Sequence, residues 1–133
     1  MLFMLDTNIC IALIKHQPPK VLKRLETQSP GEVGLSTVTL GELRYGVEKS
    51  RAIDRNQRAL EEFLLPLEIF DFDEKAAAAY GSVRAFLESS GKPIGPLDTQ
   101  IGAHALSLGA ALVTNNTREF ARIPNLKVIN WME

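Results

Sequence analysis

The chain has 133 residues, of which 45% are hydrophobic and 23% charged, and its formal net charge is −1. These values predict one folded domain over residues 1–133 and exclude a disordered chain, and Cys10 as the only cysteine excludes an intramolecular disulfide framework or a cysteine-rich metal site. No apolar run approaches the roughly 20 residues of a membrane span, and the start lacks the basic residues and longer apolar core of a signal peptide, so we expect a cytoplasmic protein.

The first half of the chain alternates short apolar runs with helical patterns. Residues 2–5 predict a buried strand, and residues 7–15 predict a helix. A second helix begins at Pro18 and Pro19, which suit a first turn, and runs to about residue 28. A strand over 33–38, a helix over 39–49 and an amphipathic helix over 53–65 follow.

The second half continues the same alternation. It predicts a strand over 67–72, an alanine-rich helix over 73–90, a loop over 91–96 and a helix over 98–109. Strands over 111–114 and 127–130 flank a short helix near 117–121. The order predicts an α/β fold: a three-layer sandwich in which helices cover both faces of a mostly parallel, five-stranded sheet. In such sheets ligands bind beyond the carboxyl ends of the strands.

Four acidic residues fall near those strand ends. Asp6 directly follows the first strand, and Glu42 lies about one helical turn after the second. Asp98 opens the helix that leads into the fourth strand, and Glu119 follows that strand. Carboxylates gathered in one cleft repel one another, and a bound divalent cation removes that conflict. Oxygen ligands without cysteine or a suitable histidine pair favour Mg²⁺, with Mn²⁺ as the alternative, over zinc.

Each of these acids also has an ordinary structural explanation. Asp6 and Asp98 suit helix N-caps, and Glu42 suits an exposed helix face. Glu119 lies three residues after Asn116, which is capping-box spacing. The evidence for a functional site is therefore that all four acids lie at strand ends. This inference depends on the predicted strand topology.

Small polar residues accompany the acids at the same edge: Thr7, Asn8, Thr114 and Asn116. They are candidates to orient the carboxylates or to bind metal-associated water, although such residues also serve as turn and cap residues. His104 lies six residues after Asp98, which turns it away on a helix, so we interpret it as structural or exposed. The aromatic residues, Phe86 among them, are interpreted as core or partner contacts.

Three segments together resemble the PIN-domain ribonucleases, and more narrowly the VapC toxins of bacterial VapBC toxin–antitoxin modules. They are MLDTN (4–8), STVTLGELRYGVEKS (36–50) and IGPLDTQIGAHALSLGAALVTNNTREF (94–120). The resemblance implies a PIN-like fold in which Asp6, Glu42 and Asp98 hold the metal. Two residues compete for the fourth acidic position, Glu119 and Asn116, and we favour Glu119 as the fourth catalytic acid.

The resemblance further implies a metal-dependent endoribonuclease that uses water to cleave RNA, leaving a 5′-phosphate and a 3′-hydroxyl. Its expected substrate is structured RNA, with tRNA anticodon stem-loops as the leading class, and its expected effect is to inhibit translation and growth. Its expected partners are a second copy of itself and a VapB-type antitoxin, with a higher toxin–antitoxin assembly as a further option.

Basic residues outside an acidic cleft are needed to attract an RNA backbone. Residues 1–58 contain 9 Lys and Arg against 6 Asp and Glu, whereas residues 59–133 contain 6 against 10. The candidates for backbone contact are Arg44, Lys49, Arg51, Arg55 and Arg118.

Other classes of protein fit less well. A receiver-type signalling domain, with Asp71 or Asp73 as phosphoacceptor, requires an acidic pair after the first strand and a lysine after the fifth, but Lys127 precedes that strand. A haloacid-dehalogenase-like phosphatase requires an aspartate where Asn8 stands. A non-catalytic binding module of the PIN fold and a nuclease acting on DNA remain as alternatives.

Overall fold

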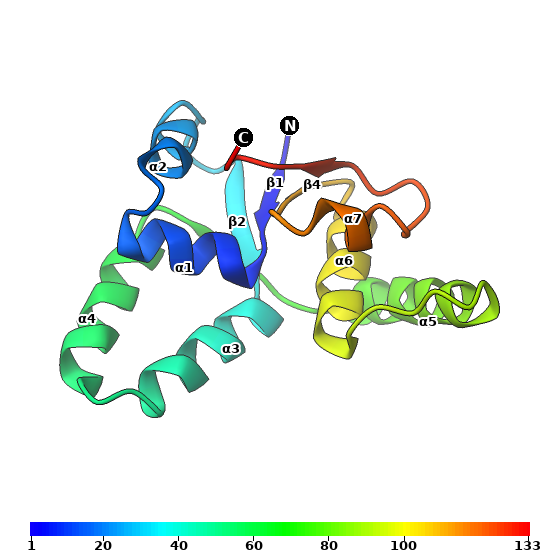
Figure 1. The fold of residues 1–133 in the computed structure, drawn as a ribbon, viewed down its shortest axis with the longest axis horizontal. Coiled ribbons are helices and arrows are strands. Elements are labelled where there is room, and N and C mark those ends of the chain that lie inside the picture. Colours follow the sequence, from blue (N-terminus) through cyan, green and yellow to red (C-terminus); the bar gives the residue numbers. More distant parts are fainter.

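The computed structural model describes residues 1–133 throughout (Figure 1). In chain order the elements of the first half are β1 (Phe3–Leu5), α1 (Thr7–Lys15), α2 (Pro19–Glu26), β2 (Val33–Ser36), α3 (Thr37–Glu48) and α4 (Ile53–Leu64). Those of the second half are β3 (Glu68–Phe70), α5 (Glu74–Ser89), α6 (Pro96–Leu108), β4 (Ala111–Val113), α7 (Thr117–Phe120) and β5 (Val128–Ile129). None of the helices has the length and apolar character that crossing a membrane requires.

The five strands form one sheet in the order β3-β2-β1-β4-β5, and every neighbouring pair is parallel. The predicted fold class is confirmed, and the sheet is wholly rather than mostly parallel. Met4 of β1 pairs with Gly34 of β2, and Leu5 pairs with Val113 of β4. The carboxyl ends of β1, β2 and β4 therefore lie together at one edge of the sheet.

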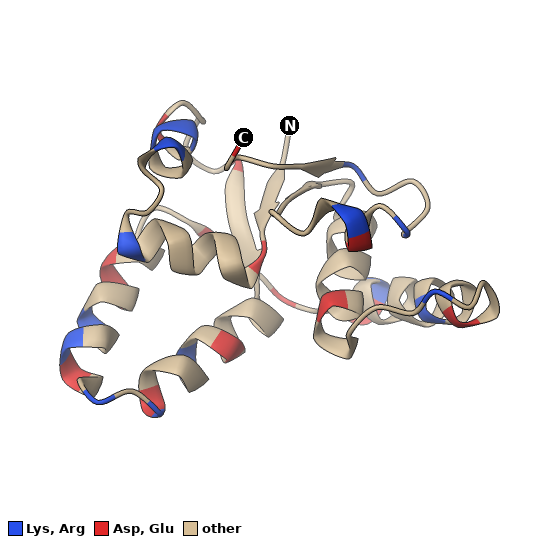
Figure 2. Cartoon of the chain, viewed as in Figure 1, with Lys and Arg blue, Asp and Glu red and all other residues tan.

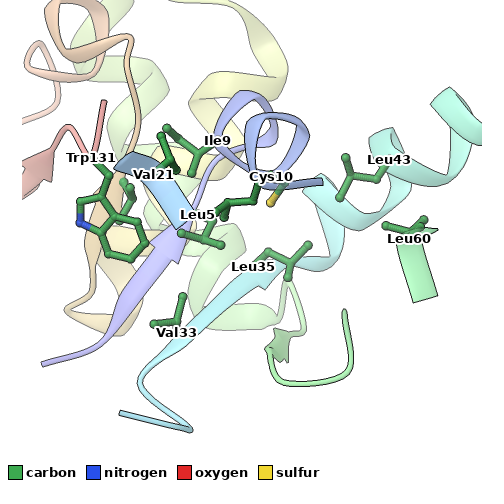
Figure 3. Packing of buried hydrophobic residues seen from close by; sticks show 11 residues of the cluster. Leu5, Ile9, Cys10, Val21, Val33, Leu35, Leu43, Leu60 and Trp131 are labelled. Carbon is green, nitrogen blue, oxygen red and sulfur yellow. The ribbon is translucent and has the colours of Figure 1, made fainter. Parts of the chain in front are cut away.

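Successive side chains of the central strands supply two separate cores, because they point to opposite faces of the sheet. Leu5 and Val113 join a cluster with α1, α2, α3 and α4, and Figure 3 shows Leu5 and Leu35 beside Cys10 of α1. Met4 and Leu112 join the other cluster, which α5, α6 and α7 cover. The result is the predicted three-layer sandwich of helices, sheet and helices.

Two predicted helix starts were wrong: a side-chain cap explains the start of α3, and a proline at the first helical position explains that of α6. Helix α3 begins at Thr37 rather than at 39, because the Ser36 hydroxyl accepts a hydrogen bond from the Val38 N–H at 3.0 Å and ends the strand. Helix α6 begins at Pro96, a residue suited to a first helical position. Asp98 is therefore the third residue of α6 and does not open the helix as predicted.

His104 of α6 joins three parts of the fold. Its side chain is buried, its Nδ1 lies 2.9 Å from the Ser36 hydroxyl oxygen at the start of α3, and its ring packs edge-on against Phe72, 5.3 Å away. Of the two interpretations of this histidine, the structural one is correct. Burial lowers the pKa of His104, and the charges of Asp73 and Asp71 only partly oppose that effect.

Gly34 occupies a place in β2 where a side chain does not fit. A Cβ atom there would press against the Glu68 carbonyl oxygen and lie 2.6 Å from a ring carbon of Phe70. We expect Gly34→Ala to lower the free energy of unfolding by about 1–3 kcal/mol, since the strand must shift. Gly81→Ala is the control: nothing lies near that position in the exposed middle of α5, and alanine favours the helix, so it should stabilise the protein. Urea denaturation of both variants is the measurement, and equal effects would contradict the packing argument.

The buried His104 predicts a loss of stability in mild acid. The pKa of His104 is lower in the folded state than its ordinary value of 6.5. Below pH 6.5 the unfolded chain therefore binds a proton that the folded protein does not, and this stabilises the unfolded state relative to the folded one. We expect the thermal midpoint to fall as the pH drops from about 7.5 to 5.5, the range in which histidine titrates. His104→Gln should flatten this dependence, whereas His16→Gln, at an exposed helix end, should retain it. An unchanged slope in His104→Gln would contradict the assignment.

Candidate functional site

The sheet order creates a topological switch point between β1 and β4, which we call the crevice. After β1 the chain enters α1, which packs on one face of the sheet, and after β4 it enters α7, which packs on the other (Figure 1). The two connections therefore diverge at the carboxyl ends of adjacent parallel strands. In open α/β sheets this switch point is where ligands bind.

Asp6 lies at the base of the crevice, and the backbone fixes its place. Its N–H donates to the Val113 carbonyl at 3.0 Å, which extends the pairing of β1 with β4 by one residue. Its side chain is 4% exposed, and Oδ1 accepts a hydrogen bond from the Ile9 N–H at 2.9 Å. Asp6 is therefore the N-cap of α1, one of the two roles considered for it, but the cap occupies only one carboxylate oxygen.

The surroundings of Asp6 disfavour its charge. Burial is the largest cause and raises the pKa of its carboxyl group, whereas the nearby Thr114 hydroxyl and the Ile9 N–H lower it. The charges of Asp98 and Glu42 raise the pKa again. A buried carboxylate that faces two further carboxylates is arranged for a cationic ligand rather than for stability of the empty fold.

The Thr7 hydroxyl orients Glu42. Its Oγ1 donates to Glu42 Oε1 at 2.8 Å and lies 3.4 Å from the Thr39 hydroxyl oxygen. Thr7 is the first residue of α1, and Glu42 is half-buried in α3. One short contact thus fixes the carboxylate of α3 relative to the capped end of α1.

Asp98 and Glu119 complete the group from α6 and α7. Asp98 is half-buried in the first turn of α6, and burial, with the charges of Glu119 and Glu42, raises the pKa of its carboxyl group. Asn116 Nδ2 donates to Glu119 Oε2 at 3.0 Å, so both candidates for the fourth position lie side by side. The capping-box alternative is wrong, because the Asn116 N–H donates to the Thr114 hydroxyl instead.

The chemistry of this donor set fits a hard divalent cation. All four side chains offer carboxylate oxygen, and the charge effects on Asp6 and Asp98 link the four acids. No three of the acidic, histidine or cysteine side chains converge closely enough to enclose an ion as they stand. Because like charges repel, closer approach of the four carboxylates would depend on a cation between them.

Several other predicted residues take no part in the crevice. Asn8 is exposed and makes no side-chain hydrogen bond. Arg44 forms an ion pair with Glu61, and the Lys49 ammonium lies over the ring of Tyr45 at 5.0 Å. Arg51 and Arg55 are exposed at the turn from α3 to α4, beyond the far end of α3.

Arg118 differs from those cations, because it lies on α7 directly beside Glu119. Figure 2 shows the adjacent blue and red segments of this helix. The sequence analysis missed Lys92 and Arg122, which the fold brings near Arg118, and it missed the contact of His104 with Ser36. The available signal was weak: Arg118 and Arg122 are four residues apart, but α7 ends at Phe120 and Arg122 lies in the turn that follows it.

The fold and the crevice define an α/β/α domain with an acidic switch point. Comparison with known proteins identifies the family to which this domain belongs. The sequence model of the PIN domain family matches residues 3–126. The chain is 46% identical over 129 residues to the tRNA(fMet)-specific endonuclease VapC of Shigella flexneri, which covers 97% of both chains. It is 45% identical to Ribonuclease VapC2 of Rickettsia felis over 98% of both chains.

Solved structures agree with the sequence comparison. The fold matches VapBC2 of Rickettsia felis bound to a promoter DNA fragment with a TM-score of 0.93 and 44% identity, covering 98% of this chain and 99% of that one. It matches DNA-bound VapBC of Salmonella typhimurium with a TM-score of 0.93 and 45% identity over the same shares. The chain belongs to the PIN domain family, within its VapC group.

The cost of burying Asp6 predicts that removing its charge stabilises the protein. In Asp6→Asn the side-chain oxygen still caps α1, while the buried charge and its repulsion by Asp98 and Glu42 disappear. We expect the thermal midpoint in EDTA at neutral pH to rise by a few degrees, the shift that about 1 kcal/mol produces. Asp73→Asn is the matched control, since Asp73 caps α5 in the same way but is exposed. A midpoint no higher than that of Asp73→Asn would contradict the argument.

Proposed function

We propose that this protein is a metal-dependent endoribonuclease that cleaves structured RNA, with the tRNA anticodon stem-loop as the leading substrate class. The carrying observation is the placement of four carboxylates, from the end of β1 and from α3, α6 and α7, at one switch point of the sheet. The names of the relatives, a tRNA(fMet)-specific endonuclease and a ribonuclease, support RNA rather than DNA as the substrate.

The residues that would hold the cation are Asp6, Glu42 and Asp98, with Glu119 as the fourth acid. Held by these residues, Mg²⁺ or Mn²⁺ would supply activation of a water molecule at neutral pH and would offset negative charge on the scissile phosphate. Thr7 holds Glu42 Oε1, and Asn116 holds Glu119 Oε2, so each of these acids keeps one oxygen free for the crevice. Glu119 Oε1 is therefore the atom we assign to accept a hydrogen bond from the attacking water.

The positions of the two histidines decide which cleavage products we propose. His104 is buried and contacts Ser36, and His16 follows α1 at the end opposite Asp6. Neither imidazole is placed to deprotonate an RNA 2′-hydroxyl. Attack by water is the route these residues support, and it leaves a 5′-phosphate and a 3′-hydroxyl.

In the cell we propose that this activity inhibits translation and growth, and that a VapB-type antitoxin restrains it. The support is that the matching Rickettsia and Salmonella structures are VapBC complexes. We further propose that the protein acts as a homodimer in the cytoplasm, where tRNA is available, and assembles further with its antitoxin.

The test is cleavage of total bacterial RNA by antitoxin-free protein in Mg²⁺, Mn²⁺ or EDTA, with sites mapped by end-specific sequencing. We expect discrete cuts in tRNA that require the cation. Asp6→Asn and Asp98→Asn should each reduce the rate at least about a hundredfold, because a cation site contributes several kcal/mol and each 1.4 kcal/mol corresponds to a factor of ten.

Asp73→Asn is the control for loss of an acidic cap outside the crevice, and it should cleave like the parent protein. Activity that persists in EDTA or in folded Asp6→Asn would overturn the metal assignment. Cuts confined to DNA would overturn the substrate class. RNA binding without cleavage would indicate a binding module instead.

A further inference from the structure

A basic groove lies outside the acidic crevice, between the carboxyl-terminal end of α5 and α7. Its volume is about 460 Å³, and its lining includes Phe86, Lys92, Arg118 and Arg122. No acidic residue lines it. Three cations around one hollow create a positive potential that is focused rather than spread over the surface.

The cations of the groove are free to bind an external anion. The ion pairs of the structure join Arg44 to Glu61, Arg84 to Glu88 and the N-terminus to Glu32, so none involves the groove. The only side-chain hydrogen bond among the three cations runs from Arg122 Nη1 to the Pro93 carbonyl at 3.1 Å. That bond ties the loop that carries Lys92 to the segment after α7, so it assembles the groove without neutralising it.

Helix α7 connects the groove to the acidic crevice. Arg118 and Glu119 are consecutive residues: Asn116 donates a hydrogen bond to Glu119, and Arg118 lines the groove. A polyanion whose phosphate lies at the four acids therefore has a cation of the groove, Arg118, one residue away from Glu119 along α7.

Phe86 gives the groove an apolar contact as well. The sequence analysis interpreted this residue as a core or partner contact, but the ring is 46% exposed and borders the three cations. An exposed aromatic ring beside basic side chains is the arrangement that binds unpaired nucleotides, because bases stack on the ring while cations contact the backbone.

We propose that this groove holds an unpaired RNA segment next to the cleaved bond, with Lys92, Arg118 and Arg122 on its phosphates and Phe86 under one base. The proposal rests on the function proposed above and extends it by naming where the substrate strand lies. Of the expected backbone contacts it keeps Arg118, adds Lys92 and Arg122, and leaves out the four residues of α3, α4 and the turn between them: Arg44, Lys49, Arg51 and Arg55.

The test measures how salt affects binding of a short unstructured RNA, labelled with fluorescein, to protein in which Asp6→Asn prevents cleavage. Each phosphate contact contributes about 0.7 to the slope of log K against log salt concentration for a single strand. Replacing Lys92, Arg118 and Arg122 by glutamine should therefore reduce the slope by about 2. Phe86→Leu should weaken binding about 5- to 100-fold and leave the slope unchanged.

The matched control replaces Arg51, Arg55 and Arg58 by glutamine, which removes the same charge from the exposed start of α4. This variant should keep the parent slope. If both triple variants lose the same amount from the salt-dependence slope, the effect is one of overall charge, and the proposed role of the groove is rejected. The double variant Lys92→Gln with Arg118→Gln, which leaves the Arg122 bond to Pro93 intact, should still lose about 1.4 from the slope.

Cleavage assays on the unaltered Asp6 background separate this inference from the proposed function. The groove variants should raise KM with kcat nearly unchanged, because they remove binding that is shared by ground and transition states. If the parent protein cleaves RNA in a metal-dependent way but the groove variants have an unaltered KM, the proposed function stands and the proposed role of the groove is rejected. Loss of antitoxin binding by the triple variant, with RNA binding intact, would assign the groove to a protein partner instead.

Discussion

The buried carboxyl group of Asp6 is the interaction on which the site depends. Its backbone extends the pairing of β1 with β4, its side chain caps α1, and its charge faces Asp98 and Glu42. The first two contacts stabilise the fold, whereas the buried charge opposes it. Because the cap uses one oxygen and the ladder uses only the backbone, the fold holds this carboxylate in place against the repulsion that would otherwise drive it toward water.

The two glutamates of the site are each oriented by one polar neighbour. Thr7 contacts Glu42 across α1 and α3, and Asn116 contacts Glu119 within one turn. Long-range placement comes from the sheet order, and fine orientation comes from these single hydrogen bonds. Such an arrangement leaves one oxygen of each glutamate free, and it lets the carboxylates adjust without disturbing either hydrophobic core.

The sequence was sufficient for the architecture and for the acids because both follow from strong local signals. Apolar runs mark the strands, and each acid near a strand end inherits its position from the parallel order. The errors fall at helix starts, where a cap at Ser36 and a proline at the first helical position, Pro96, decide the boundary. The partners of Arg44 and His104 were not predictable in the same way, because Glu61 and Ser36 reach them only through packing of different elements.

The division of charge resolves an apparent conflict in a protein of net charge −1 that is proposed to bind a polyanion. An acidic crevice alone repels phosphate, and side-chain cations within it would compete with a metal ion for the carboxylates. The fold places the two kinds of charge on neighbouring side chains of α7, with Glu119 hydrogen-bonded by Asn116 and Arg118 in the groove. Attraction of the RNA strand and chemistry on one phosphate can then be served by adjacent residues of a single short helix, without either set of charges neutralising the other.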